Sequence, residues 1–185
     1  MKPAATAAAI ATAVGNGEAK ARDVVAAALA RIAKHNEALG AFTDVTPDRA
    51  LARADAVDRA IAGGGRPPPL AGVPFAVKNL YDIEGLVTRA GSKISRSNRS
   101  ATKDATLIQR LEFAGAILVG ATNMDEYAYG FTGENAHDGP SRNPHDTERM
   151  TGGSSAGSAS ATAAGLVPLA LGSDTNGSIR VPASF

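Results

Sequence analysis

The chain has 185 residues, of which 44% are hydrophobic and 20% are charged, and its formal net charge is +1. This composition is that of a globular domain with a substantial core, and it gives no reason to expect a nucleic acid partner. The absence of cysteine excludes disulfides, thiolate metal sites and a cysteine nucleophile. No apolar run is long enough to cross a membrane, and the first residues lack the features of a signal peptide, so we expect a cytoplasmic protein.

The first third of the chain is expected to be mainly helical. The Ala-rich residues 6–14 predict a short helix, and the apolar spacing over 21–36 predicts a longer one with His35 at its end. A cation at that end of a helix offsets the helix dipole. A strand is then expected over 39–45.

A third helix is predicted over residues 47–61. Thr46 is placed to cap its N-terminus, Pro47 suits its first position, and Asp48 lies in its first turn. The glycine run 63–65 is expected to end the helix.

The next feature is a lysine that follows an apolar run. Prolines bracket residues 73–77, which lead into Lys78, so the pattern predicts a short buried strand that delivers Lys78 at its end. Burial lowers the pKa of a lysine because the charged form loses its hydration, and a neutral lysine can act as a general base. The alternative is a solvated surface lysine, as most lysines are.

The second half of the chain alternates between strand and helix patterns. We expect a helix over 104–114, a strand over 116–121, a helix of small residues that ends near Ala164, and a strand over 168–171. Residues 130–153 are rich in turn formers and should be mostly loop. This order predicts an α/β sheet in a single domain.

The glycine-serine stretch 152–158 suggests a phosphate cradle at a helix N-terminus. However, no lysine follows Gly157 as a P-loop requires, and no strand precedes Gly152 as a dinucleotide fingerprint requires. The simpler interpretation is a surface loop, although the small residues of the next helix suit close packing against another element.

Two histidines, His137 and His145, lie in the polar loop, and an aspartate follows each. Either could be the base of a Ser-His-Asp triad, or both could bind a metal. Neither a G-x-S-x-G elbow nor an H-E-x-x-H motif accompanies them, so we interpret them as surface residues that bond to nearby backbone.

Three blocks in order resemble the amidase signature family. They are PLAGVPFAVKNLYDIEG with Lys78, then GATNMDEYAYGF with the later NPHD, and finally GGSSAGSASATAAGLVPLALGSDTNGSIRVPASF with Ser154 and Ser178. The two serines are 24 positions apart, which is the spacing of the family, and the chain follows the family pattern from about residue 20 onward.

The resemblance implies a Ser-cisSer-Lys triad. In it, Ser178 is the nucleophile, Ser154 is the bridging serine in a cis peptide, and Lys78 is the base. A hydroxyl can relay the proton because it both donates and accepts hydrogen bonds. The family needs neither a metal nor a cofactor for this chemistry.

The resemblance also indicates the residues around the nucleophile. We expect Asp174 and Arg180 to form an ion pair that fixes the loop. The oxyanion would be held by backbone N–H groups of Thr175, Asn176, Gly177 and Ser178. The substrate pocket is expected to include Tyr129, Thr132 and Asn135, each of which could equally stabilise the loop.

The expected fold class is therefore α/β, with the amidase signature fold: a mixed β-sheet core flanked by helices and preceded by N-terminal helices. We expect residues 1–62 to be mainly helical and 63–185 to form a portion of the catalytic core. Since family members are more than twice as long, the sequence is expected to be an incomplete, N-terminal part of one amidase domain, poorly stable and weakly active alone.

The expected activity is hydrolysis of a small linear urea-like amide, of the 1-carboxybiuret type, with release of ammonia. The alternatives are ammonia release from glutamine for tRNA amidation, hydrolysis of another amide, and a non-catalytic scaffold. The resemblance implies a small helical partner subunit, and it leaves homo-oligomers and hetero-oligomers open. No membrane and no direct nucleic acid partner are expected.

Overall fold

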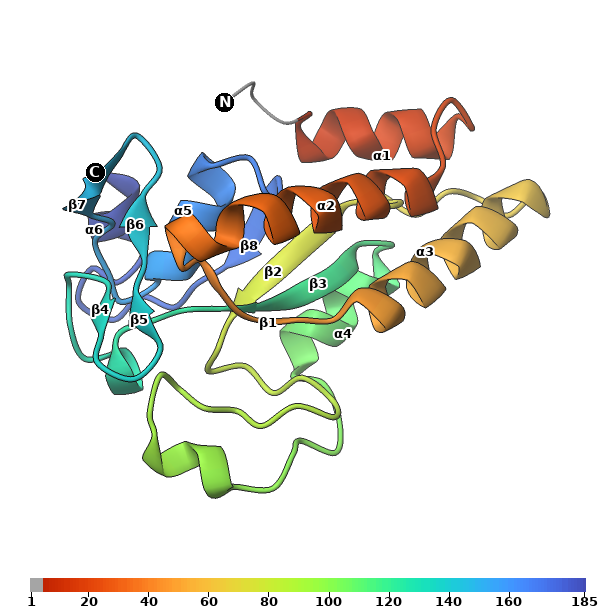
Figure 1. The fold of residues 1–185 in the computed structure, drawn as a ribbon. Helices are drawn as coiled ribbons and strands as arrows, with labels where there is room; N and C mark the ends of the chain where they lie inside the picture. The colour runs from red at the N-terminus through yellow and green to blue at the C-terminus, as the bar shows by residue number, and fades with distance from the viewer. Residues whose placement is uncertain (1–4) are drawn as a thin grey trace.

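A computed structural model describes residues 5–185 of the chain. Its centre is a four-stranded sheet in the order β1-β3-β2-β8 (Figure 1). Strand β1 is antiparallel to β3, whereas β3, β2 and β8 are parallel, so the predicted mixed sheet is confirmed. The four strands are Phe42–Val45 (β1), Pro74–Lys78 (β2), Ile117–Thr122 (β3) and Leu169–Leu171 (β8).

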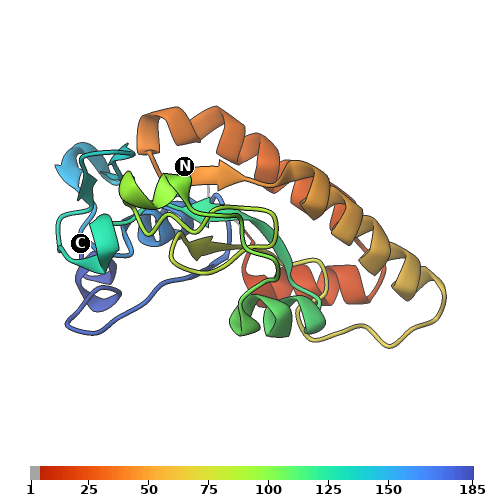
Figure 2. The ribbon, with the colours of Figure 1, turned by 90° about the horizontal axis from the view of Figure 1, so that it is seen from below.

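Helices cover the sheet on both sides, which is why every residue of β2 and β3 is buried. Figure 2 shows α2 and α3 along one side of the molecule and α1 and α4 along the other. None of the helices in the described part of the chain has the length and apolar character of a membrane span. These four helices are Ala7–Gly15 (α1), Ala21–Leu39 (α2), Pro47–Ala62 (α3) and Thr106–Phe113 (α4).

Helix α2 continues beyond the end predicted at residue 36, so His35 lies inside it rather than at its end. Gly40 ends the helix in the left-handed conformation, and its N–H donates to the carbonyl of Asn36. The Asn36 side chain then accepts the Phe42 N–H at 2.7 Å and donates to the Phe42 carbonyl at 3.0 Å. The strand therefore begins at Phe42, three residues later than expected.

Thr46 is the N-cap residue of α3, as predicted, and its carbonyl accepts the Ala50 N–H at 3.0 Å, but its side chain makes no capping bond. Its hydroxyl makes no bond to the helix and is buried without a partner among the described residues. The Thr46 N–H instead donates to the carbonyl of Val119 at 3.0 Å, so the backbone of Thr46 extends the pairing between β1 and β3. The expected Pro47 at the start of α3 and Asp48 in its first turn are confirmed.

Helix α4 begins at Thr106, two residues later than predicted. Asp104 is held away from the helix because its carboxylate accepts a hydrogen bond from Arg49 of α3, at 2.9 Å. The same oxygen accepts from the N–H of Glu84, also at 2.9 Å.

The segment predicted as mostly loop contains two small hairpins. Strands β4 and β5 pair in one, and β6 and β7 pair in the other. The signal was missed because the strands are very short and mostly lack β-branched residues. Their bounds are Glu134–Asn135 (β4), Gly139–Pro140 (β5), Arg142–Asn143 (β6) and Asp146–Met150 (β7).

Helix α5 (Ala156–Ala163) follows the glycine-serine stretch and packs against the sheet. A Cβ at Gly157 would lie 2.2 Å from the Ala41 carbonyl oxygen, so only glycine allows this approach. This contact confirms the close packing expected of the small residues. The remaining short helices, all missed from the sequence, are Ile94–Ser97 (η1), Glu126–Ala128 (η2) and Arg180–Ala183 (α6).

Candidate active site

Lys78 is the last residue of β2, and its side chain is fully buried, as the sequence predicted. Its Nζ donates to the hydroxyl of Ser154 at 2.7 Å and to the hydroxyl of Ser173 at 2.9 Å. Burial lowers the pKa of Lys78 from 10.5 to about 8, although the negative charges of Asp125 and Asp174 oppose this shift. An amine with this pKa is partly neutral near physiological pH, as a general base must be.

Ser154 lies fully buried in the loop between β7 and α5. The peptide bond between Gly153 and Ser154 is cis, as the family resemblance implied. Two backbone contacts hold this loop: the Gly153 N–H donates to the carbonyl of Phe131 at 2.9 Å, and the Asp125 N–H donates to the carbonyl of Ser154 at 3.3 Å. The loop that contains Ser154 is therefore fixed by the segment after β3.

Ser178 is 7% exposed and lies beside the Ser154 loop, because its carbonyl accepts a hydrogen bond from the Ser155 N–H at 3.0 Å. The Ser178 hydroxyl has no hydrogen-bond partner within residues 5–185. The structure thus joins Lys78 to Ser154 directly and places Ser178 beside the Ser154 loop through the backbone of Ser155.

The predicted ion pair between Asp174 and Arg180 is present. The guanidinium of Arg180 donates to both carboxylate oxygens of Asp174, at 2.8 and 3.0 Å. The same carboxylate also accepts the backbone N–H groups of Gly177, Ile179 and Arg180. These bonds, first of all those from the Arg180 side chain, hold the pKa of Asp174 far below its usual range, and they fix the loop before Ser178 around this carboxylate.

One of the four expected oxyanion donors is already occupied. The Gly177 N–H donates to Asp174 at 2.8 Å, so it is not free for a substrate in this structure. The N–H groups of Thr175, Asn176 and Ser178 bond to no acceptor among the described residues. An oxyanion role for these three groups stays a prediction.

Ser173 is a contact of Lys78 that the sequence reasoning missed. Strands β2 and β8 are parallel neighbours, and Val77 pairs with Leu171. Residues just after both strands therefore meet at one edge of the sheet, which brings Ser173 to the amine of Lys78. A polar residue soon after a predicted strand was the available signal, but the pairing of the two strands could not be read from the sequence.

The three residues expected in the pocket have different surroundings. Asn135 is buried, and its side chain is fully engaged with backbone groups of Gly91, Met124, His137 and Asp138. These bonds support the second of the two expected roles for Asn135, stabilisation of the loop. Tyr129 is 93% exposed, and the Thr132 hydroxyl accepts from the Glu134 N–H at 3.3 Å. Pocket roles for Tyr129 and Thr132 stay predictions.

Phe131 is an aromatic residue near the nucleophile that the sequence reasoning did not single out. A Cβ at Gly177 would lie 3.7 Å from its ring, and the ring is partly exposed. Since the Phe131 carbonyl also accepts the Gly153 N–H, this residue bridges the two serine loops.

The two loop histidines bond to neither serine. His137 contacts Glu126, with 3.2 Å between Nε2 and Oε1, and the His145 N–H donates to the side chain of Asn143. Within residues 5–185, histidine and acidic side chains do not form a group of three that could hold a metal.

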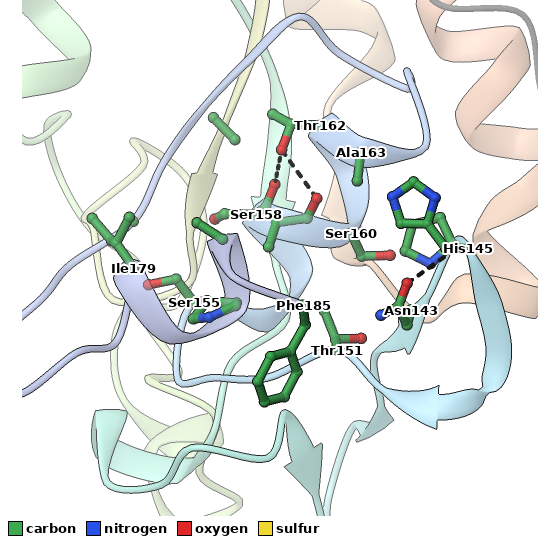
Figure 3. Close-up of a pocket in the computed structure, with 16 residues that line it drawn as sticks. Asn143, His145, Thr151, Ser155, Ser158, Ser160, Thr162, Ala163, Ile179 and Phe185 are labelled. Atoms are coloured by element: carbon green, nitrogen blue, oxygen red, sulfur yellow. Dashed lines mark hydrogen bonds between the residues drawn. The ribbon is translucent and has the colours of Figure 1, made fainter.

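A cavity of about 270 Å³ lies near the lysine and the two serines. None of Lys78, Ser154 and Ser178 lines it. Figure 3 shows it between α5, α6 and the β6–β7 hairpin, with Thr151, His145 and Phe185 around it. Hydroxyls of α5 that face it are already bonded, for example that of Ser160 to the carbonyl of Arg142. The cavity therefore lies beside the lysine-serine cluster, because its lining includes Ser155 and Ile179, the residues that follow Ser154 and Ser178.

Comparisons with curated proteins identify several relatives. Over 172 residues the chain is 60% identical to AtzE, the 1-carboxybiuret hydrolase subunit of Pseudomonas sp. (strain ADP), covering 93% of this chain and 38% of that protein. Over 170 residues it is 49% identical to a glutamyl-tRNA(Gln) amidotransferase subunit of Symbiobacterium thermophilum, covering 91% of this chain and 35% of that protein. The chain therefore spans less than two-fifths of the length of these relatives.

Solved structures with the same fold include a protein complex described as revealing the evolutionary origins of an s-triazine catabolic enzyme. It matches with a TM-score of 0.96 and 58% identity, covering 97% of this chain and 39% of that chain. The peptide amidase from Stenotrophomonas maltophilia matches with a TM-score of 0.89 and 35% identity, covering 96% and 38%. The amidase family model matches residues 23–185, and the chain belongs to the amidase signature family.

Proposed function

We propose that this chain carries the catalytic residues of an amidohydrolase that cleaves a small linear urea-like amide, of the 1-carboxybiuret type, and releases ammonia. The observation that carries the proposal is the 2.7 Å hydrogen bond between the buried amine of Lys78 and the hydroxyl of Ser154. A buried lysine with a pKa of about 8, bonded to a buried serine beside a second serine, has the chemistry of a proton relay.

In the proposed reaction, neutral Lys78 takes the proton of Ser154 while Ser154 takes the proton of Ser178. The Ser178 oxygen attacks the amide carbon, and the resulting oxyanion is held by backbone N–H groups of the 175–178 loop. The C–N bond then breaks, the proton returns through the relay to the leaving nitrogen, and ammonia departs. Water attacks the acyl-enzyme and restores the Ser178 hydroxyl.

The Ser154–Ser178 hydrogen bond of this relay is absent from the structure. Catalytic hydrogen bonds are often long in free enzymes and tighten once the substrate is bound. Ser173 supports the relay as a positioning residue, since it gives the amine of Lys78 a second acceptor at 2.9 Å.

The choice of substrate rests on similarity. The chain is 60% identical to the 1-carboxybiuret hydrolase relative and 49% identical to the amidotransferase relative. The second candidate is therefore a glutamine amidase that supplies ammonia for amidation. We also propose a cytoplasmic location, the division into residues 1–62 and 63–185, and a hetero-oligomer with a small helical subunit.

Ammonia release separates these candidates. The 185-residue chain is incubated with biuret and, in parallel, with glutamine, and a Ser178→Ala variant serves as the control. Ammonia from biuret alone, lost in the variant, supports the proposal. Ammonia from glutamine alone favours the second candidate, and release that is unchanged in Ser178→Ala would remove Ser178 from the mechanism.

A further inference from the structure

Asp125 carries a buried carboxyl group that the proposed reaction does not use. The residue is 3% exposed, and neither carboxylate oxygen has a hydrogen-bond partner of regular geometry among the described residues. The nearest donors are the backbone N–H groups of Gly133 and Glu134, which lower the pKa of the carboxyl less than burial raises it. Burying an ionised carboxyl group costs free energy unless the group is paired with a cation or hydrogen-bonded.

The carboxyl group lies against the loop that contains Ser154. A Cβ at Gly153 would lie 2.1 Å from Oδ2 of Asp125, and a Cβ at Gly130 would lie 2.8 Å from the same oxygen. The backbone of Asp125 is attached to the same loop, because its N–H donates to the carbonyl of Ser154 at 3.3 Å. Asp125 therefore contacts the Gly153–Ser154 segment with both its main chain and its side chain.

Lys78 is the cation whose charge acts on this carboxyl group. The negative charge of Asp125 raises the pKa of Lys78 against the larger effect of burial, and Asp174 acts in the same direction. On the side of Asp125, Lys78 lowers the pKa of the carboxyl and Glu134 raises it. The negative charges that act on the amine are thus those of Asp125 and Asp174, and Asp125 is also in contact with the Ser154 loop.

We propose that Asp125 is a positioning residue of the Lys78–Ser154 pair: its buried carboxyl group anchors the Gly153–Ser154 segment and keeps a negative charge near the amine. The inference deepens the proposed function and, for its effect on turnover, rests on it. Asp125 takes no part in bond making or breaking. Two measurements that need no turnover test it.

The first measurement is the titration of Lys78, followed by NMR of ¹³Cε-labelled lysine and assigned with a Lys78→Met variant. In Asp125→Asn, we expect the titration midpoint of Lys78 to move to lower pH by about one unit, because the negative charge that stabilised the ammonium form is gone. The matched control is Glu134→Gln, which removes an exposed carboxylate from the adjacent hairpin and should leave the midpoint unchanged. An unchanged midpoint in Asp125→Asn, or an equal shift in both variants, would overturn the proposed charge effect.

The second measurement is a double-mutant cycle on thermal unfolding. It does not use Asp125→Asn, so it tests the proposal even if that variant folds poorly. Gly153→Ala should lower the melting temperature, because its Cβ would meet the Asp125 carboxyl group. The loss should be smaller in an Asp125→Ala background, where that carboxyl group is absent. Equal losses in both backgrounds would show that the carboxyl group does not anchor Gly153. Neither measurement depends on turnover, so a failure to release ammonia would bear on the proposed function and not on the role of Asp125.

Discussion

Lys78 and Ser154 are 76 positions apart in the chain, yet the amine of one donates to the hydroxyl of the other at 2.7 Å. Parallel pairing of β2 with β3 and β8 delivers Lys78 to one edge of the sheet, and the loop before α5 brings Ser154 to the same place. The contact is fully buried at both ends, so water does not compete for it.

Replacing Ser154 should stop the relay while leaving the fold in place. In Ser154→Ala we expect turnover to fall by about 100- to 10,000-fold, the range for loss of a general acid–base group. Steady-state ammonia release measures this effect. The control is Ser160→Ala, another buried serine, whose hydroxyl bonds to the carbonyl of Arg142 outside the site. Equal losses in the two variants would point to stability rather than to proton transfer.

Ser173 should act through the orientation of Lys78. Ser173→Ala removes one of the two acceptors of the Lys78 amine, so we expect a lower pKa for Lys78 and a lower kcat. Ser173→Thr retains the hydroxyl and should restore both values. The pH profile of kcat/KM checks the shift, and a threonine variant as impaired as the alanine variant would argue against this role.

The pKa of Lys78 also predicts how the activity depends on pH. Because the base must be neutral, kcat/KM should rise with pH and reach half its maximum near pH 8. Activity that is already constant from pH 6 upward would mean that another group titrates.

The stability of the fold should also depend on the ionisation of Lys78. The pKa of Lys78 is about 8 in the folded protein and 10.5 as its ordinary value, so the unfolded state holds more protons between these values. The free energy of unfolding should therefore rise as pH increases from 8 toward 10.5. Urea unfolding at several pH values measures it, and the rise should disappear in Lys78→Met.

Close packing of α5 makes Gly157 sensitive to substitution. In Gly157→Ala the added Cβ would lie 2.2 Å from the backbone oxygen of Ala41, so we expect a loss of about 1–3 kcal/mol in the free energy of unfolding. The control is Gly63→Ala, where φ is −77° and the nearest atom lies 3.4 Å away. Urea unfolding should show little change there, and a similar loss in both would contradict the packing argument.

The sequence predicted the elements whose patterns are local. Apolar runs predicted β2 and β3, and proline with an acidic first turn predicted the start of α3. Predictions were less successful at residues whose conformation is decided by a bond to a residue far away in the chain. Thr46 is the N-cap of α3, but its N–H pairs with Val119 in the sheet and its side chain does not cap the helix. Asp104 bonds to Arg49 and lies outside α4.

The same distinction applies to the site. The family resemblance implied Lys78, Ser154 and Ser178. The structure bonds Lys78 to Ser154 and places Ser178 beside the Ser154 loop, and the roles of the three residues stay predictions. Ser173 and Asp125 could not be found in this way, because their importance comes from contacts with Lys78 and Gly153 across the fold.

The most direct test of the account is covalent labelling of the nucleophile with a fluorophosphonate, followed by peptide mass spectrometry. We expect a single phosphonylated residue, Ser178, and much slower labelling in Lys78→Met and Ser154→Ala than in the unaltered chain. Labelling on another residue, or equal rates in all three proteins, would contradict the lysine-serine relay.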